Sequence, residues 1–211
     1  MSGTPKISKA EADAASRVAA DRFRLAADED GLVDVAIATM PSPVGELLVA
    51  VTRRGLAAIA FDDDSRDELV ERLADELSPR VVEAARPTDE TRRELEEYFA
   101  GSRERFELRL DRRLMHPFAK QVLAATARVP FGEVTTYGTI ATRIGHPSAA
   151  RAVGAALGSN PIPIVVPCHR VIGAGGKLTG YAGGLHRKEY LLELEGAMAP
   201  RLGTEPWTST S

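Results

Sequence analysis

Residues 160–171 read Asn-Pro-Ile-Pro-Ile-Val-Val-Pro-Cys-His-Arg-Val, and this stretch organises the interpretation of the whole chain. Its apolar centre, 164–166, is typical of a short buried strand, which leads directly into Cys168 and His169. Cys168 is the only cysteine of the protein. A free cysteine is among the most buried residue types, so an inert core thiol is the simplest reading. A basic neighbour lowers the pKa of a thiol and makes it a nucleophile, and His169 and Arg170 are such neighbours.

A single cysteine in 211 residues excludes an internal disulfide framework and a multi-cysteine zinc site. No apolar run reaches the roughly 18 residues that cross a bilayer, and the N-terminus lacks the apolar stretch of a signal peptide. We therefore expect a protein that avoids membranes and resides in the cytoplasm, where a lone thiol stays reduced. The length suits one large domain or two small ones.

Charge divides the chain into two unequal parts. Residues 1–114 carry a net charge of −7, whereas residues 115–211 carry +4 and all four histidines. An anionic partner is therefore expected to meet the C-terminal part.

The first half predicts an antiparallel sheet with helices. Three apolar runs within residues 32–61 are separated by short turn sequences, which indicates a meander of strands. Leucines at four-residue spacing predict a helix at 65–77, and a second helix is expected at 88–100. A final strand at 106–110 is expected to rejoin the sheet.

The second half predicts a mainly helical domain. Helices are expected at 117–127 and 186–195, and two short helices at 137–144 and 148–157 flank a glycine-containing turn. Such a pair is a helix-turn-helix candidate, although similar pairs occur in proteins that never touch DNA. We thus expect an α+β fold with four segments. The first is an N-terminal extension at 1–30, helical or disordered, and the second is a sheet domain at 31–111. The third is a C-terminal domain at 112–196, which contains the loop around Cys168 (the cysteine loop), and the last is a tail at 197–211.

The second helix of this pair carries almost only small side chains around Arg151. Ala150 and Gly154 leave it without the long polar side chains that read bases in the major groove. It could instead press its backbone against a minor groove and insert one side chain. Tight helix packing inside the domain is the alternative interpretation.

The glycine-rich stretch 173–184 indicates a loop that approaches another group closely or adopts positive φ. Tyr181 within it could stack on or hydrogen-bond to a ligand, whereas a flexible surface hairpin is the competing reading. A carboxylate is needed to orient His169, and the candidates on the closing helix are Glu189, Glu193 and Glu195. Because adjacent residues on a strand point to opposite faces, a water could connect Cys168 to the histidine.

Together these motifs resemble the methylated-DNA–protein-cysteine methyltransferases, also called 6-O-alkylguanine-DNA alkyltransferases. The resemblance rests on the helix pair, the Asn-Pro hinge, the Pro-Cys-His-Arg-Val motif, the Tyr-x-Gly-Gly loop and the final glutamate, in one order. It covers 118–196 nearly continuously and the first half loosely. It implies a ribonuclease-H-like N-terminal domain. It implies no cofactor, and the zinc that some relatives carry is not expected because the cysteines for it are absent.

The resemblance implies a role for each matching residue in the chemistry. Cys168 would accept the alkyl group, and His169 would act as a base through a water. Glu195 would orient His169, and Asn160 would sit in the hinge before the cysteine loop.

The resemblance likewise implies the residues that bind DNA and the damaged base. Arg151 would enter the base stack in place of the expelled nucleotide, and Tyr137 would press on the 3′ phosphate. Ala150 and Gly154 would let their helix approach the groove. The pocket for the alkylguanine would be formed by four residues, namely Tyr181, Ala182, Val171 and Leu157. Ala182 stands where relatives often have serine, a change that is harmless if the contact comes from the backbone amide.

The implied activity is repair of duplex DNA by a single transfer from 6-O-alkylguanine, with 4-O-methylthymine as a second substrate. The protein would act as a monomer, able to assemble cooperatively on DNA, and would associate with the nucleoid. Two alternatives stay open: a lesion-sensing DNA-binding module that uses the helix pair, and a cysteine hydrolase that uses Cys168 and His169.

Overall fold

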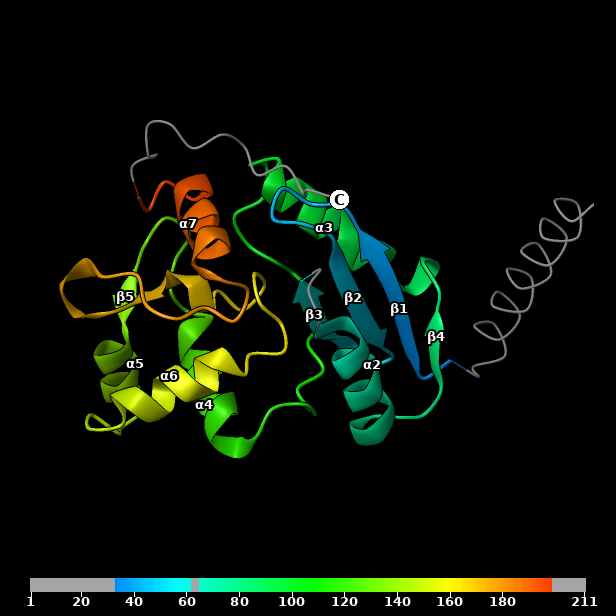
Figure 1. The fold of residues 1–211 in the computed structure, drawn as a ribbon, viewed down its shortest axis with the longest axis horizontal. Helices are drawn as coiled ribbons and strands as arrows, with labels where there is room; N and C mark the ends of the chain where they lie inside the picture. Colours follow the sequence, from blue (N-terminus) through cyan, green and yellow to red (C-terminus); the bar gives the residue numbers. More distant parts are fainter. Residues whose placement is uncertain (1–32, 62–64, 199–211) are drawn as a thin grey trace, which may run out of the picture.

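The computed structural model describes residues 33–61 and 65–198, which form two lobes side by side (Figure 1). The first lobe contains a four-stranded sheet with helices, and the second is mainly helical. This arrangement confirms the predicted α+β class. The expected extension at 1–30 and the tail beyond residue 198 lie outside the described residues.

The meander predicted for the first lobe is present. Strands β1 (Val35–Met40), β2 (Leu47–Thr52) and β3 (Gly55–Phe61) pair antiparallel in sequence order. Most of their side chains are buried. The strands are therefore covered on both faces, which explains why they read as nearly continuous apolar runs.

The edge of the sheet differs from the expectation. The fourth strand is β4 (Val81–Glu83), which pairs parallel with β1. Residues 106–110 form no strand and contribute one isolated bridge, between Leu56 and Leu110. Phe106, Leu108 and Leu110 alternate because they pack against the core, while the backbone of the segment bonds to the start of β3, at Leu56. Gly55 permits this approach, since a Cβ at its φ of +123° would lie 2.1 Å from the carbonyl oxygen of Arg109.

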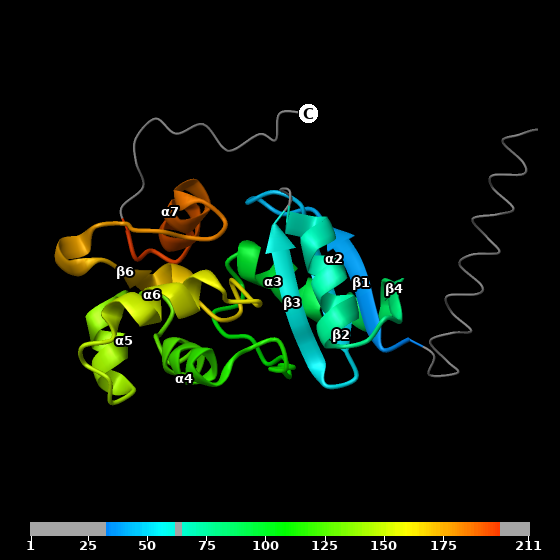
Figure 2. The ribbon, with the colours of Figure 1, turned by 60° about the horizontal axis from the view of Figure 1, so that its bottom comes forward.

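Both predicted helices of the first lobe are present, and they cover the sheet. Helix α2 (Ser65–Glu76) packs Leu73 onto one face. The 3-10 turn η1 (Arg86–Thr88) leads into helix α3 (Asp89–Phe99), which lies on the opposite face (Figure 2). Leu95 and Tyr98 of α3 belong to a core that continues into the second lobe.

The second lobe is built from four helices. They are α4 (Pro117–Thr126), α5 (Tyr137–Arg143), α6 (Ala150–Gly158) and α7 (Leu185–Leu194). Helices α5 and α6 are the predicted pair. Thr136 caps α5 by accepting a hydrogen bond from the amide of Thr139 at 3.1 Å. Helix α6 begins two residues later than expected, and its N-cap Ala149 makes no side-chain cap.

The expected strand at 164–166 is a turn instead. Three prolines, at positions 161, 163 and 167, supply no amide donors to a sheet, and the amide of Val166 bonds to the carbonyl of Ile162 at 2.9 Å. Ile164 has a φ of +71° and is fully buried. A β-branched residue in this conformation is strained, and such strain persists only where the surroundings hold the backbone.

After this turn come the 3-10 turn η2 (Cys168–Arg170), strand β6 (Val171–Ile172) and the 3-10 turn η3 (Ala174–Gly176). Strand β6 pairs parallel with β5 (Thr135–Thr136). The cysteine loop therefore joins the helix pair, which follows β5, to the glycine-rich loop.

The cysteine loop is anchored on the first lobe. The amide of Ile59 in β3 donates to the carbonyl of Pro161 at 2.8 Å. Arg187 of α7 donates to the carbonyl of Val44 at 2.8 Å, and its guanidinium lies 4.7 Å from the ring centroid of Phe61. Strand β3 thus forms one wall of the region around Cys168.

Candidate active site around Cys168

Cys168 opens η2 and is almost completely buried. Its Sγ accepts a hydrogen bond from Asn160 Nδ2 at 3.2 Å. The same nitrogen donates to the carbonyl of Val166 at 2.9 Å, while Asn160 Oδ1 accepts from the amide of Ile162 at 3.1 Å. One asparagine therefore holds both ends of the turn and points a donor at the sulfur.

The sulfur is a thiol at rest. Burial raises the pKa of Cys168, although the hydrogen bond from Asn160 and the charge of Lys188 oppose this effect. Burial also lowers the pKa of Lys188 to about 8. A buried thiol of raised pKa needs a base before it can act as a nucleophile.

The imidazole ring of His169 lies against Glu195. Its side chain is fully buried, and Nε2 lies 2.8 Å from Glu195 Oε1. Within the described part of the chain, no hydrogen bond joins the ring to Cys168 Sγ, and Nδ1 has no partner. Burial lowers the pKa of His169 more than the bond to Glu195 raises it, so the ring is neutral near pH 7.

Glu195 determines the tautomer of the His169 ring. Burial alone would raise the pKa of Glu195, but the hydrogen bonds from His169 and Arg170 and the positive charge of Arg170 lower it to about 2. An ionised carboxylate only accepts hydrogen bonds, so Nε2 of His169 must be the donor. The lone pair of the neutral ring is then on Nδ1, the atom that has no hydrogen-bond partner among residues 33–61 and 65–198.

Glu195 is the carboxylate that contacts His169, out of the three that the sequence offered. Two donors to it were not foreseen. Arg170 donates to both oxygens, at 2.7 and 2.9 Å, and to the carbonyl of Val129 at 2.7 Å. The sequence suggested only that Arg170 adds positive charge near the thiol. The hydroxyl of Tyr98 donates to Glu195 Oε1 at 2.7 Å, across 97 residues of chain.

A cavity of about 140 Å³ opens beside the sulfur. Its walls come from β3, α6, the cysteine loop and the glycine-rich loop, and they are formed by Ile59, Phe61, Leu157, Asn160, Pro163, Cys168, Tyr181, Ala182 and Gly183. Of the four predicted pocket residues, Tyr181, Ala182 and Leu157 line it. Val171 is not among the lining residues and is fully buried in β6, paired with Thr135.

Tyr181 presents an unused donor within this cavity. Its hydroxyl is buried and has no hydrogen-bond partner among the described residues. Its ring contacts Phe61 edge-on, with centroids 6.0 Å apart. Gly183 allows the loop to approach β3 this closely, since a Cβ there would lie 2.6 Å from the Phe61 ring. Lys188 Nζ fastens the loop by donating to the carbonyls of Val171 and Thr179, at 2.7 and 2.9 Å.

The predicted DNA-binding residues lie on the helix pair beside this loop. Arg151 is exposed on α6, and Ala150 begins that helix. Tyr137 begins α5 and lies next to Gly154, where an added Cβ would be 3.7 Å from the ring. Its hydroxyl accepts a hydrogen bond from Thr179 Oγ1 at 3.2 Å, which connects the pair to the glycine-rich loop.

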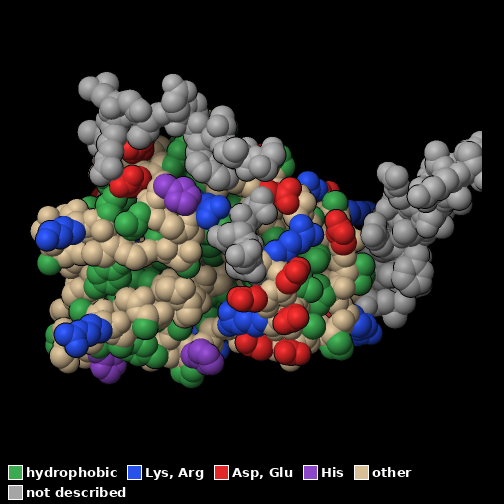
Figure 3. Space-filling model, viewed as in Figure 1, with side chains coloured by type: hydrophobic (Ala, Val, Ile, Leu, Met, Phe, Trp, Pro, Cys, Tyr) green, Lys and Arg blue, Asp and Glu red, His purple; other side chains and the backbone are tan. Residues whose placement is uncertain are grey.

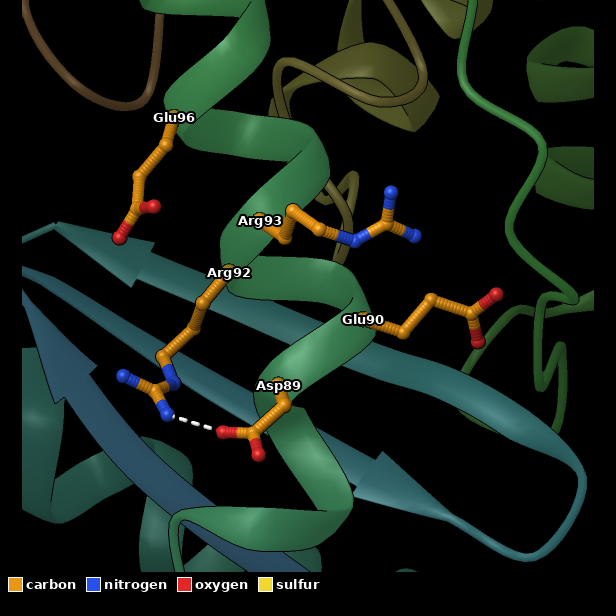
Figure 4. Close-up of a pocket in the computed structure, with 5 residues that line it drawn as sticks. All are labelled: Asp89, Glu90, Arg92, Arg93 and Glu96. Carbon is orange, nitrogen blue, oxygen red and sulfur yellow. Dashed lines mark hydrogen bonds and ion pairs between the residues drawn. The ribbon is translucent and has the colours of Figure 1, made fainter.

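The face of the second lobe in Figure 3 shows few charged side chains, whereas acidic and basic side chains gather over the first lobe. A larger open hollow lies on α3, lined by Asp89, Glu90, Arg92, Arg93 and Glu96 (Figure 4). Arg92 pairs with Asp89 there, and the lining residues are charged side chains without a cysteine, serine or histidine. We therefore place the candidate site at Cys168.

Residues 33–61 and 65–198 contain no group of three His, Cys, Asp or Glu side chains that could hold a metal ion. They also contain no helix long and apolar enough to span a membrane.

Comparison with known proteins identifies two matching family models. The 6-O-methylguanine DNA methyltransferase ribonuclease-like domain matches residues 35–112, and the DNA binding domain of the same family matches residues 117–197. A methylated-DNA–protein-cysteine methyltransferase of Methanosarcina acetivorans is 45% identical over 160 residues, which are 76% of this chain and 97% of that protein. Its counterpart in Mycobacterium tuberculosis is 56% identical over 107 residues, 51% of this chain and 64% of that protein.

Solved structures agree with these relatives. The crystal structure of Mycobacterium tuberculosis O6-methylguanine methyltransferase is 41% identical and covers 79% of this chain and 95% of its own, with a TM-score of 0.67. A structure of Mycobacterium tuberculosis OGT in complex with DNA has the same identity and TM-score and covers 78% of this chain and 95% of its own.

Proposed function

This chain belongs to the 6-O-methylguanine DNA methyltransferase family, and from that premise we propose that it repairs DNA by moving the alkyl group of 6-O-alkylguanine onto Cys168. DNA is its partner, as in the complex of the mycobacterial relative. The observation that carries the assignment to Cys168 is the cavity that holds this sulfur together with the unpartnered hydroxyl of Tyr181.

The transfer is a displacement at the alkyl carbon. The thiol proton passes to His169 Nδ1 through a water, which leaves a thiolate. Sγ then bonds to the alkyl carbon while the bond from that carbon to guanine O6 breaks. The electron pair of the broken bond remains on guanine, which gains a proton from the Tyr181 hydroxyl. Tyr181 recovers its proton from the protonated base, so overall the thiol proton moves to guanine.

The neutral state of His169 supports this route. A histidine that is unprotonated near pH 7 can accept the thiol proton, and Glu195 stabilises the imidazolium that forms. Asn160 supports the thiolate through its hydrogen bond to Sγ. The thioether product resists hydrolysis, so each molecule acts once.

The helix pair is proposed to deliver the damaged nucleotide. Guanine O6 is shielded inside a duplex, so the nucleotide must leave the stack at a cost of a few kcal/mol. Arg151 is exposed at the start of α6 and is suited to fill the gap in the stack. The small side chains Ala150 and Gly154 let α6 approach a minor groove, and Tyr137 at the start of α5 is suited to press on the 3′ phosphate.

We further propose that 4-O-methylthymine is a second substrate, and that the protein binds DNA as a monomer that can assemble cooperatively. We propose a division of labour in which residues 112–196 carry DNA binding and chemistry, and residues 31–111 support them. The reaction needs a free thiol, which suits the reducing cytoplasm.

Mass spectrometry of the full chain tests this function. Incubation with duplex DNA that contains 6-O-methylguanine is expected to add one methyl group to the peptide with Cys168, with an end-point of one methyl per protein. Cys168→Ser is expected to bind the same DNA and gain no mass. Tight DNA binding by the native protein without any mass gain would reject transfer in favour of lesion sensing, and multiple turnover on an ester or peptide would favour a cysteine hydrolase.

A further inference from the structure

We infer that Tyr98, on α3 of the first lobe, is a positioning residue for alkyl transfer: it holds the carboxylate of Glu195 and thereby tunes the basicity of His169. The inference rests on the proposed function, because it assigns His169 the role of base. It gives the first lobe an indirect part in the chemistry, through the position of Glu195.

The contact is short and excluded from solvent. The Tyr98 hydroxyl donates to Glu195 Oε1 at 2.7 Å, and both side chains are buried. The same oxygen lies 2.8 Å from His169 Nε2 and 2.9 Å from Arg170 Nη2. Three donors from two elements, α3 and η2, therefore converge on one carboxylate oxygen.

The Tyr98 ring is fixed by aromatic neighbours from both lobes. Its centroid lies 5.4 Å from that of Phe99, 5.3 Å from that of Phe106 and 6.3 Å from that of Phe131. Phe131 belongs to the turn before β5 in the second lobe, whereas Phe99 and Phe106 belong to the first. The hydroxyl is thus held where it is by packing that does not depend on the hydrogen bond, so a phenylalanine can replace Tyr98 with little disturbance.

The effect on His169 follows from competition at Oε1. A donor that bonds to a carboxylate stabilises its negative charge and weakens the bonds that it accepts from other donors. Without the Tyr98 hydroxyl, Glu195 accepts more strongly from His169 and favours the imidazolium. The other groups that face His169 are the cation of Arg170, the cation of Lys188 and the thiol of Cys168, and Tyr98→Phe leaves all of them in place.

The test is the pH profile of single-turnover methyl transfer by the full chain, native and Tyr98→Phe. The acidic limb is expected to move toward neutral pH by about half to one unit, which lowers the rate several-fold on that limb and little at pH 8.5. Tyr190→Phe is the matched control, since Tyr190 is a partly buried tyrosine of α7 whose hydroxyl is not among the donors to Glu195. Its profile is expected to follow that of the native protein.

A second measurement does not depend on transfer. An NMR titration of the His169 ring, assigned with a His169→Gln variant, is expected to show a higher midpoint in Tyr98→Phe than in the native chain. An unchanged midpoint, or a rate that falls by the same factor at every pH, overturns the inference. Tyr98 would then contribute only to packing. A native protein that gains no methyl group overturns the proposed function instead, while the NMR midpoints still judge the contact itself.

Discussion

The substitution Glu195→Gln measures how much the buried cluster of Glu195, Arg170 and His169 contributes to the free energy of unfolding. Glutamine keeps the shape of the side chain but removes the charge that Arg170 and His169 contact. Arg170 is then left as a buried cation without its carboxylate, a change that typically costs about 3–5 kcal/mol. We therefore expect a folded but clearly destabilised protein.

The lowered pKa of Glu195 gives a second measure of the same energy. The pKa of about 2 lies below the ordinary 4.5, and this difference corresponds to about 3 kcal/mol of folding stability at neutral pH. Because the pKa is lower in the folded protein, the stabilisation is complete above about pH 5 and disappears as the pH falls from about 4.5 toward 2. At pH 3 roughly 1.4 kcal/mol should remain.

Urea unfolding followed by circular dichroism at pH 7 and pH 3 measures both values. The difference in free energy of unfolding between the native chain and Glu195→Gln should shrink by about 2 kcal/mol between these two pH values. Comparing the two proteins cancels the titration of the other carboxylates. Glu96→Gln, at an exposed position of α3, serves as the control and should change little at either pH. An equal destabilisation at pH 7 and pH 3 would refute the reasoning.

Two further substitutions test nucleotide flipping and the shape of the pocket separately. Arg151→Ala is expected to slow methyl transfer from duplex DNA by about ten-fold or more, because roughly 1.4 kcal/mol of the flipping cost is no longer offset, and to leave transfer from free 6-O-benzylguanine unchanged. Arg143→Ala, an exposed arginine on α5, is the control, and an equal loss with both substrates would contradict the role of Arg151. Phe61→Leu widens the cavity wall that Phe61 forms, so the ratio of benzyl to methyl transfer should rise several-fold. A constant ratio would show that Phe61 does not limit the alkyl group.

Local sequence patterns were sufficient to predict most of the helices and strands. The apolar runs of β1 to β3 and the leucine spacing of α2 predicted those elements because burial of a strand or helix face leaves its period in the sequence. The segments where pattern misled are short. Strand β4 has three residues, of which none is fully buried, and residues 164–166 are apolar but lie between prolines that prevent a ladder.

For the candidate site, the sequence by itself determined which thiol to consider and its neighbouring histidine, because Cys168 is the only cysteine of the protein. It also limited the candidates for the carboxylate that orients His169 to the closing helix. The family resemblance pointed to Glu195 as the partner of His169, and the tertiary structure shows this contact. Only the tertiary structure decided that Arg170 pairs with this carboxylate and that Tyr98 reaches it from the other lobe. These contacts join segments separated by 25 to 97 residues. Their geometry depends on how whole elements pack, and no local period in the sequence records it.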